Sequence, residues 1–541
     1  MTPLFALRQE ADHGIGDLGA LKKLIDWCHE VGLRFILLLP VTACGRDYSP
    51  YNAISSFALE PLYLDLHDEE LFSSLGGNIP NIPRSIDGVS TEFVDYEKVA
   101  NFKHTFLYEI FLRTSGNVEL QKFVLRNRSW LDAYALFCAL AEKFQSTDFH
   151  LWPEEFRSFS HAKSTVDTSL LQRMAYQQFC QWICDKSWRR IQQYAKRRKV
   201  LLIGDLPFSI SQQSADYWQN PQQFSEKWYA GAPPEPSFQD DEFVRRWGQN
   251  WGLPVYNWKK EEKRNFPWLR KRLRRMSRFF HGIRLDHALG YFRVFAFPWH
   301  PSQNPKYLDK TPEEVLAKGG EIPRFFPAPD DSQENQQRNR ENGYRILSFL
   351  KKTLPRHLLI AEDLGLVPDY VRPVLEELKI PGMKVPYFER LAPDLSYLPV
   401  EEYPECSLAT WATHDHPPLA ALWKKWQQSR SHSDAMNWEV RCFLRFLSIE
   451  QDRTELEMPE DIHLAAIRKI SESRSAMLCL QLTDWFKLQI RYNHPGTLSV
   501  TNWSARLPFT VEELFKNHSL TYKTNQIREI LRQTLRINMP N

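Results

Sequence analysis

The chain has 541 residues, of which 43% are hydrophobic and 25% charged, as in an ordinary globular protein with a large core. Its formal net charge of +3 is small for this length, and no block of lysine and arginine stands out. Neither nucleic acid nor a membrane surface is therefore indicated as a partner. The longest purely apolar stretch, about residues 35–41, is far too short to span a bilayer.

The first residues, MTPLFALRQEADHG, lack a basic segment followed by a long apolar run, so we expect no signal peptide. Eight cysteines are few for this length, and their spacing contains no C-x-x-C pair. Most lie inside apolar segments, and Cys180 and Cys184 share one face of a predicted helix. We predict buried free thiols, neither a disulfide framework nor a metal site, and a reducing, cytoplasmic compartment.

Eight short apolar runs have the length of β-strands, with helical patterns such as 18–31, 209–219 and 366–379 between some of them. Runs without polar alternation are typical of parallel strands that are covered on both faces. Eight such strands with intervening helices predict an α/β fold, a (β/α)8 TIM barrel, although a doubly wound sheet also accommodates them. The runs are 3–7, 34–40, 200–207, 282–287, 357–365, 384–389, 407–415 and 476–484.

The spacing of these runs predicts one catalytic barrel over 1–541 with large, mainly helical insertions. The second and third runs are far more widely separated than one crossover needs, and the patterns between them predict an inserted helical subdomain over 66–199. A second insertion, 296–345, contains the polar stretch PAPDDSQENQQRNRENG. We predict a mobile loop or lid there.

Four of the runs end in an acid: Asp205, Asp286, Glu362 with Asp363, and Asp415. The carboxyl ends of parallel barrel strands open on one face, so these acids are expected to converge on one cleft. A single acid at such a position often caps the following helix. Four acids in one pattern favour chemistry instead, because clustered carboxylates repel one another and are costly to bury.

Cleavage of a glycosidic bond needs one ionised carboxylate and one protonated carboxyl group, and no metal. Arg284 lies two residues before Asp286, on the same side of the strand, and is expected to keep that carboxylate ionised by lowering its pKa. His287 is expected on the other strand face, away from the sugar. The residues alone leave open which acid is the nucleophile. The 18 tryptophans are explained mostly by a tryptophan-rich core, although sugar-binding clefts also use flat aromatic rings.

Several motifs together resemble those of the 4-α-glucanotransferases, the amylomaltase or disproportionating-enzyme family. They follow the family's order over nearly the whole chain: GIGDLGAL, SPYNAISSFALEPLYL, GDLPFSI, AGAPPE with WGQNWGLPVYNW, GIRLDHALG, IAEDLG, ATHDH and RYNHPGT with NW. The resemblance implies a (β/α)8 barrel, no cofactor, and retaining transfer of a glucan segment or glucosyl unit. The donor would be a maltodextrin, and the acceptor the 4-hydroxyl of a glucan or of glucose. A substrate-cleft loop insertion is expected over 230–262.

The resemblance also implies roles for individual residues. Asp286 matches the nucleophile, Glu362 the acid/base, and Asp415 the third carboxylate, which binds sugar hydroxyls. The positions expected to contact glucan are Tyr51, Asp205, Gln249, Trp251, Arg284, Asp363, His414 and Asn493. The sequence departs from the family pattern at His416, where a small polar residue is more usual, and at Glu235, where Asp is usual. Both departures concern acceptor binding.

Three alternatives use the same residues differently. A hydrolase of the same barrel type would use water as the acceptor. A metal-dependent barrel hydrolase is suggested by His414 and His416, which would share one strand face. A non-catalytic glucan-binding protein would have lost a catalytic acid, whereas all three are present.

Overall fold

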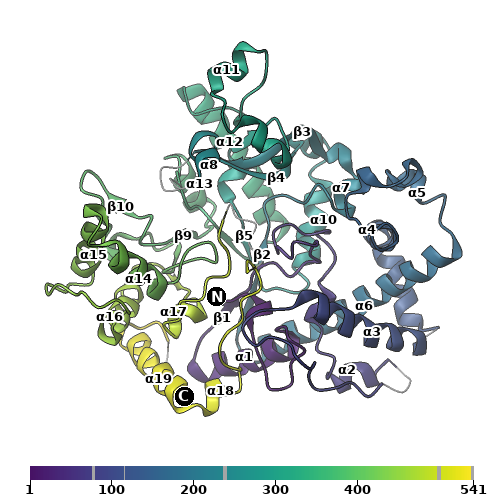
Figure 1. Ribbon diagram of the computed structural model, residues 1–541, viewed down its shortest axis with the longest axis horizontal. Helices are drawn as coiled ribbons and strands as arrows, with labels where there is room; N and C mark the ends of the chain where they lie inside the picture. The colour runs from purple at the N-terminus through teal and green to yellow at the C-terminus, as the bar shows by residue number, and fades with distance from the viewer. Residues whose placement is uncertain (76–79, 115, 235–240, 496–500, 538–541) are drawn as a thin grey trace.

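The computed structural model describes residues 1–75, 80–114, 116–234, 241–495 and 501–537, and Glu235 lies outside these ranges. A seven-stranded sheet, with every pairing parallel, occupies the centre of Figure 1. Six of the eight predicted runs contain a strand that is shorter than predicted, and the strand Gly382–Lys384 overlaps the run predicted over 384–389 only at Lys384. In spatial order the strands are β1 (Phe35–Leu37), β2 (Leu201–Leu206), β5 (Gly282–Leu285), β8 (Leu358–Ala361), β9 (Gly382–Lys384), β12 (Ser407–Ala409) and β13 (Met477–Leu478).

The first two residues of the chain connect the two edges of this sheet. Thr2 forms a parallel bridge with Leu38, next to β1, and its N–H donates to the Leu37 carbonyl at 3.1 Å. On the other side, the Met1 amino group donates to the Leu480 carbonyl at 2.6 Å, just beyond β13. The sheet is therefore curled, and the fold is α/β and barrel-like.

The strand predicted over 3–7 is wrong, because Leu4–Ala6 form a short 3-10 helix. Pro3 has no N–H to donate to a ladder, so the extended pairing ends at Thr2. Leu4, Phe5 and Ala6 are nevertheless buried, which explains why the run is apolar without being a strand.

Alternation along the strands separates two apolar groups. Leu37, Ile203, Ile360, Met383, Leu408 and Cys479 form a small cluster of their own, one residue from each of six strands or their ends. Their neighbours, such as Leu202 and Leu359, belong to the large core packed by the helices. Side chains two residues apart share a face of a strand, so Asp205 follows Ile203, and Glu362 follows Ile360, on the inner face.

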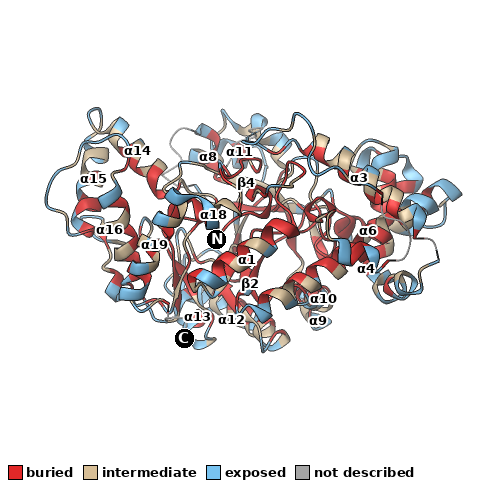
Figure 2. Ribbon diagram, turned by 90° about the horizontal axis from the view of Figure 1, so that it is seen from below, coloured by how far each residue is buried: buried red, intermediate tan, exposed pale blue. Residues whose placement is uncertain are grey.

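The helices bury one side against the sheet and expose the other, and Figure 2 shows buried residues gathered around β2 in the middle of the molecule. The helix predicted over 18–31 is confirmed as α1 (Leu18–Val31): Asp17 caps its first turn, and Gly32 ends it in a left-handed conformation, φ 92°. The other helices after the strands are α7 (Ala215–Gln219), α8 (Glu242–Trp247), α9 (Trp258–Lys263), α10 (Pro267–Met276), α11 (Pro312–Ala317), α12 (Gln333–Thr353), α13 (Val371–Glu377), α14 (Leu419–Ser429), α15 (Asp434–Phe446), α16 (Glu460–Ser471), α17 (Leu482–Trp485), α18 (Glu513–Lys516) and α19 (His518–Gln533).

Several helices lie between β1 and β2, on the right of Figure 1. The helical patterns predicted there are present, and the long α6 carries Cys180 and Cys184 with both thiols buried. All eight cysteines of the chain are free, as predicted, but three of them, Cys44, Cys138 and Cys406, are only partly buried. The helices are α2 (Glu69–Ser73), α3 (Tyr96–Arg113), α4 (Val118–Lys143), α5 (Phe159–Ala162) and α6 (Thr168–Arg197).

Two segments predicted as loops contain regular structure. An antiparallel sheet has the order β4 (Gln249–Tyr256), β3 (Phe224–Ala232), β6 (Val294–Phe297), β7 (Arg324–Phe326), and β10 (Arg390–Leu391) pairs with β11 (Ser396–Tyr397). The polar stretch expected to be mobile becomes helical at Gln333, the start of α12. Ser332 caps this helix by accepting from Asn335 N–H, and Asn339 and Asn342 are buried along it. Buried asparagines concealed its inner face in the sequence.

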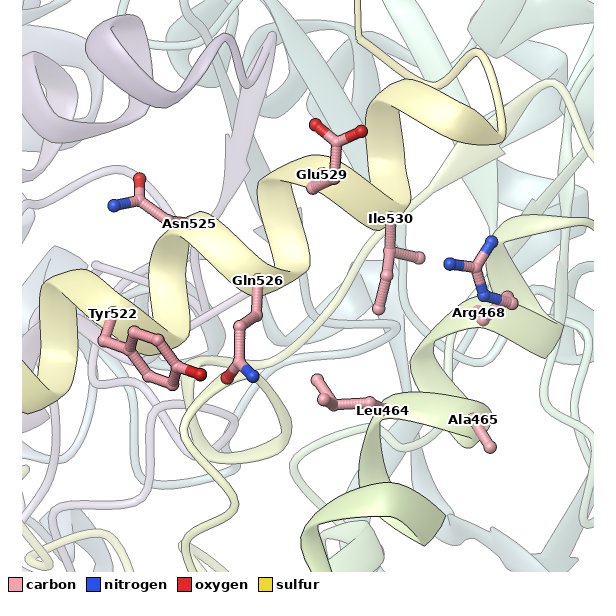
Figure 3. A pocket seen from close by; sticks show the side chains of 8 residues that line it. All are labelled: Leu464, Ala465, Arg468, Tyr522, Asn525, Gln526, Glu529 and Ile530. Carbon is pink, nitrogen blue, oxygen red and sulfur yellow. The ribbon is translucent and has the colours of Figure 1, made fainter.

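A groove of about 550 Å³ lies between α16 and α19, at the edge of the fold. Figure 3 shows Tyr522, Gln526 and Ile530 of α19 facing Leu464 of α16 across it. None of the strand-end acids lines this groove. Among the described helices, none is both long and apolar enough to cross a membrane.

Candidate active site

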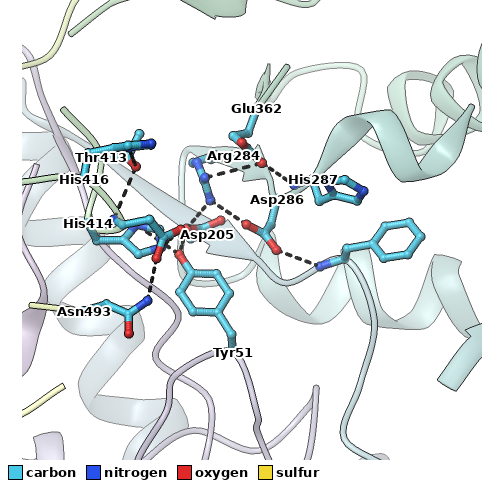
Figure 4. A network of polar contacts seen from close by, with 12 residues as sticks. Tyr51, Asp205, Arg284, Asp286, His287, Glu362, Thr413, His414, His416 and Asn493 are labelled. Atoms are coloured by element: carbon cyan, nitrogen blue, oxygen red, sulfur yellow. Dashed lines mark hydrogen bonds and ion pairs between the residues drawn. The ribbon is translucent and has the colours of Figure 1, made fainter. Parts of the chain in front are cut away.

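Three of the predicted acids, Asp205, Asp286 and Glu362, meet at the carboxyl end of the parallel sheet (Figure 4). Asp205 lies in β2, Asp286 directly follows β5, and Glu362 directly follows β8. These three strands are adjacent in the sheet. Asp415 comes from the segment after β12, a strand that is not adjacent to any of these three in the sheet. The fold thus brings together acids that are far apart in the sequence.

Arg284 lies at the centre of this cluster, with a side chain only 3% exposed. Its Nη1 donates to Asp205 Oδ2 at 2.6 Å and to Asp286 Oδ1 at 3.1 Å. Its Nη2 lies 3.8 Å from Glu362 Oε2. One buried guanidinium therefore contacts three carboxylates, which reduces their mutual repulsion.

The two central acids each also accept a hydrogen bond from the backbone. Asp286 Oδ2 accepts from Phe208 N–H at 3.3 Å, and Glu362 Oε2 accepts from His287 N–H at 2.6 Å. His287 adopts a left-handed conformation, φ 43°, which turns the chain immediately after Asp286. Asp286 and Glu362 remain partly open, with side chains 21% and 17% exposed.

Asp415 belongs to a second group of contacts next to the first. His414 Nε2 lies 3.1 Å from its Oδ2, and Asn493 Nδ2 donates to its Oδ1 at 2.6 Å. Tyr51 connects the two groups: its hydroxyl donates to Asp205 at 2.7 Å, and its ring stacks on His414 with the ring centres 4.9 Å apart. Tyr51, Asp205, Arg284, His414 and Asn493 are therefore all part of one network.

Burial raises the pKa of Asp286 to about 6, although Arg284 acts in the opposite direction. Burial also raises the pKa of Glu362 to about 7, again opposed by Arg284 and reinforced by the charge of Asp286. We expected Arg284 to hold the pKa of Asp286 below its usual value; its effect has that sign, but desolvation is larger. Of the two acids, Glu362 remains the one that keeps its proton to higher pH.

The pKa of the third acid, Asp415, is shifted in the opposite direction. Burial would raise the pKa of Asp415, but the adjacent His414 and the hydrogen bond from Asn493 outweigh it and hold that pKa well below its usual value. Burial lowers the pKa of His414, but the charge and hydrogen bond of Asp415, with the charge of Asp205, together outweigh it, so the net shift is upward. These opposite shifts favour a charged carboxylate beside a charged imidazole.

Gln249 and Trp251 of β4 lie beside the turn that follows Asp286. Trp251 Nε1 donates to Gln249 Oε1 at 3.3 Å, and the Trp251 ring meets the edge of His287 with centres 4.8 Å apart. Desolvation of the partly buried His287 imidazole lowers its pKa to about 4 and keeps it neutral at physiological pH. The antiparallel sheet thus supplies one wall next to the central acids.

Asp363 is not brought into this network, although it adjoins Glu362. Its carboxylate is 1% exposed, accepts from Met383 N–H at 2.6 Å and lies 3.6 Å from Arg372. Burial raises its pKa to about 6. Alternation along an extended segment places consecutive side chains on opposite faces, so only one of the two acids can point inward.

The sequence reasoning missed donors that belong to the backbone, above all Phe208 N–H and His287 N–H, because any residue type can supply them. It also missed Arg491, which donates to the Asp415 carbonyl at 3.0 Å. His416, a departure from the family pattern, has its Nδ1 2.8 Å from the Thr413 hydroxyl. Within the described residues no cluster of three or more His, Cys, Asp or Glu could hold a metal ion.

Comparison with known proteins places this geometry in context. The 4-alpha-glucanotransferase family model matches residues 2–511. A 4-alpha-glucanotransferase of Chlamydia pneumoniae is 30% identical over 534 residues, covering 95% of this chain and 91% of that protein. One from Aquifex aeolicus is 28% identical, covering 92% of each chain. An amylomaltase from Streptococcus agalactiae, solved with acarbose, superposes with a TM-score of 0.78 at 22% identity, covering 99% and 98% of the two chains.

Proposed function

Because the chain belongs to the 4-alpha-glucanotransferase family, with the activity of that family, we propose that it acts by double displacement at the Arg284 cluster. The observation that carries this proposal is the contact of one buried arginine with Asp205, Asp286 and Glu362. It keeps two partly exposed carboxyl groups beside each other with different pKa values, as a retaining mechanism needs.

In the first step Glu362 gives its proton to the leaving glycosidic oxygen while Asp286 attacks the anomeric carbon. The C–O bond to the leaving sugar breaks, and a glycosyl ester forms on Asp286. In the second step Glu362, now ionised, takes the proton from the 4-hydroxyl of an acceptor sugar, which displaces Asp286. Two inversions leave the α-configuration unchanged.

Asp415 is proposed as the carboxylate that binds sugar hydroxyls, because it is 40% exposed and is kept ionised by His414 and Asn493. Its two oxygens are already held by these neighbours, so it is fixed before a sugar arrives. Tyr51, Asp205, Arg284, His414 and Asn493 would shape the subsite at the cleavage point. Gln249 and Trp251 would line the adjoining wall, and a glucan contact for Asp363 stays a prediction.

The finer architecture is also proposed. We infer a (β/α)8 barrel with large, mainly helical insertions, in which Met1 and Thr2 complete the ring between β13 and β1. The helices from α2 to α6 support an inserted subdomain over 66–199. The antiparallel strands support insertions over 230–262 and 296–345 that contribute to the cleft. Eight free cysteines support a reducing, cytoplasmic compartment.

Maltotriose as the only substrate tests transfer against hydrolysis. Transfer predicts a ladder of shorter and longer maltodextrins with glucose and no net gain in reducing ends, because each bond broken is replaced by another. Hydrolysis with water as the acceptor predicts glucose and maltose and a steady gain in reducing ends. That second outcome would contradict the proposal. Adding free glucose should speed the turnover of longer donors if glucose is an acceptor.

A further inference from the structure

A buried arginine outside the cluster contacts the segment that supports Asp286. Helix α10 has the sequence PWLRKRLRRM, which suggests a basic, solvated helix. Arg272, however, is 1% exposed. Its guanidinium approaches three consecutive carbonyls directly after β2: Pro207 at 2.7 Å, Ser209 at 3.4 Å and Phe208 at 3.5 Å.

The carbonyl of Pro207 and the N–H of Phe208 belong to the same peptide group. That N–H donates to Asp286 Oδ2 at 3.3 Å. The peptide is trans and planar, so its C=O and N–H point in opposite directions. Arg272 therefore binds one end of a peptide group whose other end contacts the carboxylate of Asp286.

The surroundings of Arg272 differ from those of a structural ion pair. Within the described residues, no carboxylate lies within ion-pair distance of it; its further contacts are the Tyr256 hydroxyl, at 2.9 Å, and the Trp268 ring. Arg275, one turn along the same helix, is also buried but pairs with Asp185.

An opposing charge near Arg272 is that of buried Asp216: burial raises the pKa of its carboxyl group, and the charge of Arg272 acts against this. The hydrogen bonds of Arg272 nevertheless go to neutral acceptors, the three carbonyls and the tyrosine hydroxyl. Burying a cation without a directly bonded carboxylate is costly, so we expect Arg272 to do more than pack.

We propose that Arg272 is a positioning residue for the nucleophile, acting through the Pro207–Phe208 peptide group. It holds the carbonyl of that peptide, which keeps the N–H directed at Asp286, and its positive charge polarises the peptide so that the N–H is a stronger donor. This proposal rests on the role of Asp286 in the proposed function.

The test compares Arg272→Met and Arg272→Lys with the unchanged chain in maltotriose disproportionation across pH. Arg272→Met should lower kcat by about tenfold or more, because the attacking oxygen is less well oriented, and should leave KM within about twofold. The acid side of the kcat/KM profile should move to higher pH, because ionised Asp286 loses a hydrogen bond that favours it. Arg272→Lys, which keeps the charge but not the fork of donors, should fall between the two.

Arg275→Lys is the matched control, since it changes the same residue type on the same helix away from residues 207–209. It should leave the pH profile in place even if it lowers the melting temperature. If Arg272→Met does not fold, Arg272→Lys and Tyr256→Phe remain; the latter removes one acceptor of Arg272 and should shift the acid side slightly in the same direction. An unchanged kcat and acid side in the folded Arg272 variants would overturn the proposal.

A donor with a fluoride leaving group separates this proposal from the proposed function. Alpha-maltosyl fluoride should form a glycosyl ester on Asp286 that intact-mass and peptide analysis detect. If no ester forms on Asp286 in the unchanged chain, the proposed function fails. If it forms there, and forms equally fast in Arg272→Met, only the role of Arg272 fails.

Discussion

Two clusters of buried charge in this molecule contain acids with raised pKa values, yet they differ in how their oxygens are used. In the first, Arg284 contacts Asp205, Asp286 and Glu362, and the latter two are 21% and 17% exposed. In the second, Lys103 lies 3.8 Å from Asp17, with side chains 0% and 1% exposed. Burial raises the pKa of Asp17 to about 7, as high as that of Glu362.

The second cluster has a structural role, because it connects segments that are distant in the sequence. Asp17 Oδ1 accepts from Gly19 N–H and Ala20 N–H at the start of α1. Lys103 Nζ donates to the Leu62 and Leu64 carbonyls, both at 2.7 Å, which fixes α3 to the segment before α2. A perturbed pKa therefore does not by itself locate catalysis. The distinguishing feature is an acid that is both perturbed and open to a substrate.

The largest expected effect separates the two clusters directly. Asp286→Asn should reduce turnover of maltotriose by about 10⁴-fold or more, because the amide cannot form the glycosyl ester, while glucan binding stays within a few fold. Initial rates and calorimetric titration with a maltodextrin measure the two quantities. Asp17→Asn is the control from the closed cluster and should keep its turnover. Activity above a trace in Asp286→Asn would mean that another residue attacks.

Replacing the proposed proton donor should have a smaller effect, and one that depends on the leaving group. Glu362→Gln should lower maltotriose turnover by about 10³-fold, within the range typical of general acid catalysis. With alpha-maltosyl fluoride, formation of the glycosyl ester should be much less affected, because fluoride leaves without a proton. Rapid-quench measurement of fluoride release checks this. An equal loss with both donors would remove Glu362 from the role of acid.

The pH profile of the activity should be bell-shaped, with a narrow maximum. In the proposed roles Asp286 acts ionised, so activity should fall as the pH drops through about 6, and Glu362 acts protonated, so activity should fall as the pH rises through about 7. The two acids interact, so the apparent pKa values of the two limbs describe the pair together and not either residue alone. The maximum of kcat/KM for maltotriose should lie between these values. A flat profile from pH 5 to 9 would contradict this assignment.

The smallest effect on turnover is expected in the closed cluster. Lys103→Met leaves Asp17 buried without its cation and should lower the free energy of unfolding by about 3–5 kcal/mol. The kcat of the folded fraction should not change, because the contacts of Lys103 among the described residues go to Asp17, Leu62 and Leu64, away from the Arg284 cluster. Denaturant unfolding measures the free energy of unfolding, and initial rates divided by the concentration of folded protein measure kcat. A large fall in kcat at full folding would mean that the two clusters are coupled.

The sequence predicted the part of the site that depends on alternation along buried strands. Asp205, Asp286 and Glu362 were found because each ends an apolar run, and parallel strands end on one face. Asp363 could not be separated from Glu362 until the direction of each side chain was known. The backbone donors at Phe208 and His287 carry no residue-type signal. The helix from Gln333 was missed because its buried face includes asparagines, which pattern reasoning takes for loop residues.

The contacts of Arg284 have a consequence for the distribution of charge during the proposed reaction. In the proposed mechanism Asp286 is anionic and Glu362 neutral before the attack; once the ester has formed, Asp286 is neutral and Glu362 anionic. Arg284 lies 3.1 Å from one acid and 3.8 Å from the other, so it faces one negative charge from this pair in both states. The negative charge moves from one side of the guanidinium to the other, so forming the covalent intermediate does not change the number of negative charges that this pair presents to Arg284.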